Sequence, residues 1–70
     1  MTNINLNNLI LKAKIYKVYC YTLGNEFILG EYPELTTAIE KGKEWLGNNI
    51  IPNGKNSWKN DDGDKICIEF

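Results

Sequence analysis

The clearest hydrophobic pattern in the chain is helical and covers residues 33–49. Apolar side chains recur there at intervals of three and four residues, and polar side chains occupy the opposite side. Pro33 suits the first turn of a helix, whereas Thr37 begins a capping-box pattern, so the start carries two rival signals. Gly47 suits the left-handed conformation that ends many helices. We therefore predict one central helix over about residues 34–47.

Gly42 lies in the middle of the apolar stripe of this predicted helix. A glycine inside a helix costs roughly 1 kcal/mol relative to alanine, so its presence needs a compensating contact. We infer that the helix approaches a sheet closely at this residue, and an aromatic ring is a candidate for the contact.

Alternating apolar and polar residues predict a β-hairpin over residues 14–32. Gly24-Asn25 suits a two-residue turn, which places Leu23 opposite Glu26. In that register one face suits the helix and holds Val18, Cys20, Phe27 and Leu29, with Glu31 opposite Val18. The other face holds Lys17, Tyr19, Tyr21, Ile28 and Tyr32. A single helix cannot cover both faces.

A second hairpin is predicted for residues 57–70, after a connection that Pro52 interrupts. Its first arm holds Trp58, its bend is Asp61-Asp62-Gly63-Asp64, and its second arm alternates Ile66 and Ile68 with Cys67 and Glu69. The fold class expected for residues 1–70 is one small α+β domain. Two hairpins form an antiparallel sheet of about four strands, packed on the central helix.

The first 13 residues fit two interpretations. Leu6, Leu9, Ile10 and Ala13 have the spacing of a short helix, yet residues 9–11 could equally lead into the first strand. We include a short N-terminal helix among the expectations.

Cys20 and Cys67 are the only cysteines, and the chain has no histidine. A His-based catalytic triad and an imidazole metal site are therefore excluded, and we expect no metal and no cofactor. Two buried reduced thiols are expected, with a disulfide between neighbouring strands as the alternative.

The sequence lacks the signatures of several other classes. No apolar run approaches the ~20 residues of a membrane span, and the start does not resemble a signal peptide, so we expect a cytoplasmic protein without membrane contact. Neither a nucleophile elbow nor a nucleotide-binding motif is present. We expect neither enzymatic activity nor a small-molecule substrate.

Charge is unevenly distributed along the chain. Residues 1–25 hold three Lys and no acid, whereas residues 26–70 hold five Lys and nine acids. Arg is absent, and Asn, Ile and Lys are abundant, as in proteins from AT-rich genomes. This composition suggests a small accessory or inhibitor protein of a phage or mobile element.

The leading functional hypothesis is a protein-binding module that covers a partner surface or dimerises. Tyr and Trp concentrate binding energy at interfaces, and an acidic bend could meet a basic surface. The predicted binding residues are Tyr19, Tyr21, Tyr32, Trp58, Asp61, Asp62 and Asp64.

The alternative hypothesis is a nucleic-acid-binding domain. Lysines that alternate with tyrosines are typical of sheets on which bases stack while cations hold phosphates. The residues in this pattern are Lys12, Lys14, Tyr16 and Lys17, followed by Tyr19 and Tyr21. The absence of Arg weakens the alternative, because Arg supplies the planar fork suited to phosphate and guanine.

Overall fold

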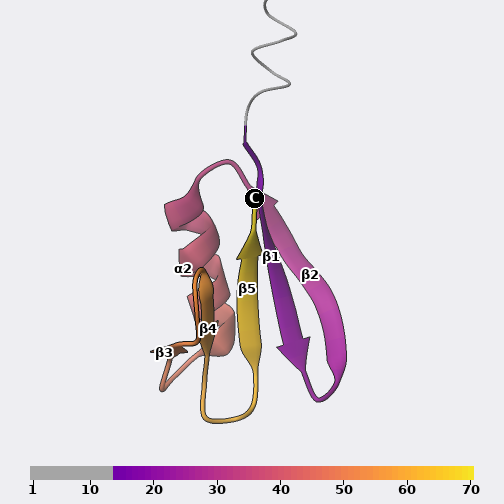
Figure 1. Cartoon of the computed structure of the whole chain (residues 1–70), viewed down its shortest axis with the longest axis vertical. Helices are drawn as coiled ribbons and strands as arrows, with labels where there is room; N and C mark the ends of the chain where they lie inside the picture. The colour runs from indigo at the N-terminus through magenta and orange to yellow at the C-terminus, as the bar shows by residue number, and fades with distance from the viewer. Residues whose placement is uncertain (1–13) are drawn as a thin grey trace, which may run out of the picture.

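The computed structural model describes residues 14–70, which form a five-stranded antiparallel sheet with one helix on one of its faces (Figure 1). The elements are β1 (Tyr16–Thr22), β2 (Asn25–Tyr32), α2 (Leu35–Leu46), β3 (Ile51–Pro52), β4 (Ser57–Lys59) and β5 (Lys65–Glu69). Their order across the sheet is β2-β1-β5-β4-β3. The predicted α+β class is confirmed. The count exceeds the predicted four strands because the segment at Pro52 adds the two-residue strand β3. The predicted N-terminal helix lies outside the described residues.

Helix α2 matches its predicted bounds to within one residue at each end. Glu34 is the N-cap in an extended conformation, and the Thr37 hydroxyl donates to Glu34 Oε1 at 3.5 Å, so the helix starts between the two predicted signals. At the other end Gly47 has φ 86°, and its N–H donates to the Lys43 carbonyl at 2.9 Å. Within residues 14–70 there is no helix long and apolar enough to cross a membrane.

The core lies between α2 and the sheet, and its members are Val18, Cys20, Ala38, Leu46, Ile66 and Ile68. Gly42 is buried at the centre of this contact, where an added Cβ would run into Ile66 Cδ1 and lie 3.4 Å from Val18 Cγ1. The predicted close approach of helix and sheet is therefore confirmed, and the contact is aliphatic rather than aromatic.

The first hairpin turns one residue earlier than predicted. Thr22 pairs with Asn25, so the two turn residues are Leu23 and Gly24, with φ of 50° and 82°. Positive φ at both turn residues matches the twist of the flanking strands. The earlier turn places Phe27 opposite Cys20 on the helix side, where its ring packs edge-on against Trp45 at 5.6 Å.

A β-bulge at Leu29 then changes which face each later residue of β2 occupies. Tyr19 pairs with Ile28, but Val18 pairs with Gly30, so Leu29 is the extra residue. Because side chains alternate along a strand, one extra residue exchanges the faces. The prediction that Tyr32 shares a face with Tyr19 and that Glu31 faces the helix was therefore wrong. The bulge turns the charged Glu31 outward and packs Tyr32 against the core.

The second hairpin is built around Asn60, a buried residue that the sequence analysis overlooked. Its side chain Nδ2 donates to the Leu46 carbonyl at 2.8 Å and to Asp64 Oδ2 at 3.3 Å. Its Oδ1 accepts the N–H groups of Asp62 and Asp64, at 2.9 and 3.0 Å. Asn60 thus shapes the acidic bend and ties it to the end of α2. In β5 the predicted alternation is confirmed, since Ile66 and Ile68 are buried against the helix.

Candidate functional site

The face of the sheet opposite α2 is the candidate site, and we call it the open face. None of the described helices or strands packs on it, since α2 lies against the other side of the sheet. Strand pairing arranges its residues in three rows that run across the strands from β2. The Lys17 row is Glu31, Lys17 and Glu69; the Tyr19 row is Ile28, Tyr19, Cys67 and Ser57; the Tyr21 row is Glu26, Tyr21, Lys65 and Lys59.

The two tyrosines at the centre of the open face interact with charged neighbours. Tyr19 donates its hydroxyl to Glu69 Oε1 at 3.1 Å, and this hydrogen bond, with desolvation and nearby acids, raises the pKa of Tyr19. Hydrogen bonding to Glu26, followed by burial, raises the pKa of Tyr21. The ammonium of Lys65 lies 4.8 Å from the centre of the Tyr21 ring. Both tyrosines therefore keep their protons. Their side chains contact charged groups on adjacent strands.

Charges surround these tyrosines in equal numbers, with Glu26, Glu31 and Glu69 against Lys17, Lys59 and Lys65. Among residues 14–70 the one ion pair within 4.0 Å is Lys41 with Glu44, on α2. The charged side chains of the open face therefore form no ion pair within 4.0 Å among residues 14–70. Glu69 instead accepts a hydrogen bond from the Tyr19 hydroxyl, and Lys65 lies against the Tyr21 ring.

Two hollows adjoin the tyrosines. One, of about 360 Å³, lies between Tyr19, Tyr21, Cys67 and Glu69. A larger one, of about 460 Å³, lies between the turns of the two hairpins. Leu23 lines the larger hollow and is 90% exposed. The surface beside the tyrosines is thus hollowed rather than flat.

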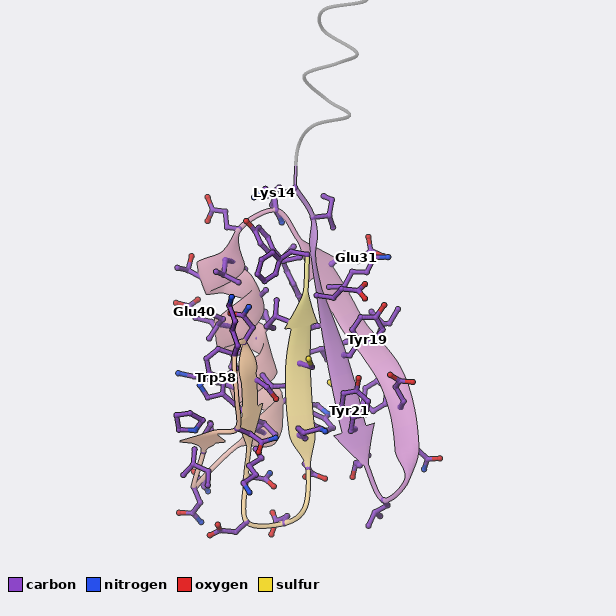
Figure 2. The ribbon with its side chains drawn as sticks, viewed as in Figure 1. Lys14, Tyr19, Tyr21, Glu31, Glu40 and Trp58 are labelled. Carbon is purple, nitrogen blue, oxygen red and sulfur yellow. The ribbon has the colours of Figure 1, made fainter. Side chains whose placement is uncertain are left out.

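The structure separates the four aromatic residues predicted to bind a partner. Tyr19 and Tyr21 lie on the open face, over β1 in Figure 2. Tyr32 lies on the helix side, where it lines a hollow with Trp45. Trp58 pairs with Ile66 and so also faces the helix side, with the Lys43 ammonium 5.3 Å from its ring centre. No single flat surface among the described residues presents all four.

The predicted acidic residues differ in exposure and in hydrogen bonding. Asp61 and Asp62 are exposed on the bend. Asp64 accepts hydrogen bonds from the Thr22 hydroxyl and from Asn60, so it joins the bend to the end of β1. Its carboxylate is engaged within the chain.

The residues of the nucleic-acid alternative are also dispersed. Lys12 lies outside the described residues, and Lys14 is exposed just before β1. Tyr16 faces the helix side, where its ring packs against Phe70 at 5.3 Å. Lys17 is on the open face, between Glu31 and Glu69 in its row. This leaves few unopposed cations beside the tyrosines.

Cysteine chemistry is limited by where the two thiols lie. Cys20 pairs with Ile66 and Cys67 with Tyr19, so the two thiols point to opposite faces and cannot bridge within one chain. Burial raises the pKa of Cys20 to about 11, which keeps that thiol neutral. Residues 14–70 hold no group of three or more His, Cys, Asp or Glu placed to bind a metal.

Sequence reasoning missed the importance of Glu26, Lys59 and Lys65. They are ordinary surface charges in the sequence, and only the register of three strand pairs brings them into the Tyr21 row. Comparisons of the chain with protein families, with curated proteins and with solved structures found no match.

Proposed function

We propose that this protein is a non-catalytic protein-binding module that works through the open face, by covering the surface of a protein partner or of a second copy. The observation that carries the proposal is the contrast between one face closed by α2 and an opposite face with two tyrosines at its centre. Ile28 adds an apolar side chain that is 48% exposed. Partly exposed aromatic and aliphatic groups inside a charged rim are typical of a binding surface.

A protein partner fits this face better than a nucleic acid does. Glu31 and Glu69 flank Lys17 in its row, and Glu26 lies beside Tyr21 in the next. These carboxylates would repel a phosphate backbone that reached the tyrosines. A protein surface can offer both signs of charge and so match the pattern.

The shifted pKa values support a binding role over a catalytic one. Nucleophiles and general bases usually need a side chain that loses its proton near neutral pH. In Tyr19, Cys20 and Tyr21 the pKa moves upward, so each group holds its proton more firmly.

Site-specific photocrosslinking in the native cell tests the proposal. A photoreactive phenylalanine replaces Tyr21 on the open face, and the matched control replaces Thr36, which is exposed on α2. We expect a covalent protein adduct from position 21 that is absent or much weaker from position 36. Equal labelling from both positions, or none from either, would contradict the proposal. An adduct removed by nuclease would instead support the nucleic-acid alternative.

A further inference from the structure

We infer that the open face is complementary to itself and binds a second copy of this chain, related by a twofold axis that runs parallel to the strands between β1 and β5. The inference rests on the proposed function and names the partner of the same surface. It follows from the order of the charges along the three rows.

The axis determines which strands meet. Rotation about an axis parallel to the strands keeps each residue at its height along the strand and reverses the strand order. With the axis between β1 and β5, β1 of one copy faces β5 of the other, and β2 faces β4. Two sheets packed face to face keep their strands within about 30° of parallel, so each row still meets its own counterpart.

Opposite charges then meet in two of the three rows. In the Lys17 row, Lys17 faces Glu69 of the second copy, and the symmetry makes this contact twice. In the Tyr21 row, Glu26 faces Lys59 of the second copy. Each contact joins a carboxylate to an ammonium, which favours this pairing over others.

Ring contacts accompany the charge contacts. Tyr21 faces Lys65 of the second copy, which repeats between chains the cation and ring contact already present within one chain. In the Tyr19 row, Tyr19 faces Cys67, and both residues are partly exposed. The middle row of the proposed interface thus has no charged residue, and charged residues lie in the rows on either side.

Three other twofold arrangements place like charges together. An axis over β1 sets Lys17 against its own copy, and an axis over β5 does the same with Glu69. An axis across the strands, through the Tyr19 row, sets Glu26 against Glu31, which offsets the opposite charges that it brings together at Lys65 and Glu69. Like charges directly opposed are destabilising. An axis between β2 and β1 opposes Lys17 with Glu31, but it leaves β5 and β4 with no facing strand, so the axis between β1 and β5 is the favoured one.

The free chain also carries a repulsion that this pairing relieves. Lys59 and Lys65 are direct cross-strand neighbours on the open face. Neighbouring like charges on a sheet cost stability, and Glu26 of the second copy supplies the missing carboxylate.

The association should be weak. Strands lie about 4.8 Å apart and rise about 3.3 Å per residue, so the patch formed by β2, β1, β5 and β4 measures roughly 20 by 17 Å. A standard stable interface takes about 800 Å² from each partner, which exceeds this patch. The dimer should therefore form only at high chain concentration, and salt should weaken it.

The test uses two charge-reversal variants of the full chain, Glu26→Lys and Lys59→Glu. Sedimentation equilibrium at chain concentrations up to about 1 mM and low salt measures the Kd of each. The wild-type chain should dimerise, and each variant alone should bind itself roughly tenfold or more weakly, because two like-charge contacts form per dimer. An equimolar mixture should dimerise about as well as wild type, since both contacts between unlike chains join opposite charges.

The mixture separates binding from folding, because mixing two damaged chains does not repair either fold. A wild-type chain that stays monomeric, or variants that dimerise as well as wild type, would overturn the inference. So would a mixture no better than its components. In each case a crosslink from position 21 to a different protein would still support the proposed function.

Discussion

The two faces of the sheet are made by the same strands and yet differ in every respect that matters for function. On the helix side, Val18, Cys20 and Ile66 are fully buried, and Val18 and Ile66 lie against Gly42. On the open face the alternate residues Tyr19, Tyr21 and Cys67 are partly exposed, with charged residues around them. The buried core thus lies on one face, and the proposed binding surface lies on the other.

The same residue type on each face gives the largest expected contrast. Ile66→Ala removes a fully buried side chain at the contact with Gly42 and should lower the free energy of unfolding by about 2–5 kcal/mol. Ile28→Ala removes one that is 48% exposed and should cost less than ~1 kcal/mol. Urea denaturation followed by circular dichroism measures both in dilute solution.

A domain of this size has only ~3–5 kcal/mol of stability, so Ile66→Ala is expected to be largely unfolded. Ile66→Val provides the graded control, with an expected loss of ~0.5–1.5 kcal/mol. Equal losses for the two alanine variants would contradict the division between the faces.

Substitution of Asn60, which links the helix to the second hairpin, should cause the next largest loss of stability. Asn60→Ala removes the hydrogen bond to the Leu46 carbonyl and the two that shape the bend, in a side chain that is 6% exposed. Loss of buried partners costs ~1–3 kcal/mol, so the free energy of unfolding should fall by about that amount. Asp61→Ala, at an exposed neighbour, should change it by less than ~0.5 kcal/mol. A matching loss at Asp61 would show that Asn60 has no special role.

The two cysteines lie on opposite faces, and only Cys20 is expected to make the stability depend on pH. Burial raises the pKa of Cys20 from 9.0 to about 11, so the folded state retains a proton that the unfolded state releases. The stability that this proton contributes is complete below pH 9.0 and declines as the pH rises towards about 11. Thermal unfolding should therefore show a Tm that falls between pH 9 and pH 10.

Cys20→Ala should remove that part of the decline, and Cys67→Ala should retain it. The comparison belongs below pH 10.0, since above it Tyr19 and Tyr21, whose pKa values are also raised, add a further decline shared by both variants. A pH dependence that is unchanged in Cys20→Ala would assign the decline to other groups.

The smallest expected effect lies at the hairpin turn, which belongs to neither face. Leu23 has φ 50° and is 90% exposed, so it pays for a left-handed backbone without burying its side chain. Asn tolerates that conformation, and Leu23→Asn should raise the free energy of unfolding by ~0.5–1 kcal/mol. Gly24→Ala, at φ 82°, should lower it, which makes a control of opposite sign. If Leu23→Asn is less stable, Leu23 makes contacts that its exposure conceals.

Local pattern was sufficient for the helix and for the existence of both hairpins. Helix α2 follows from a periodic stripe that ends at Gly47, and β5 follows from the alternation of Ile66 and Ile68 with Cys67. Such signals depend on residues close together in the sequence, so they could be predicted.

The composition of the candidate site was harder to predict. Its charged rows join strands that are far apart in the chain, such as the pairing of Lys17 with Glu69. Asn60 was overlooked because its main partner, the Leu46 carbonyl, belongs to another element. The sequence contains no local pattern that marks either relationship.

The sequence by itself determined that this protein has one amphipathic helix and alternating strands, because periodicity is a property of neighbouring residues. It also determined that Tyr19 and Tyr21 share a face, since they are two residues apart on one strand. The tertiary structure decided that the turn falls at Leu23-Gly24 and that Leu29 forms a bulge, and it is the bulge that sends Tyr32 to the helix side and Glu31 to the open face. That register comes with the packing of Phe27 on Trp45 and of α2 on the sheet, and such contacts exist only after distant segments have met.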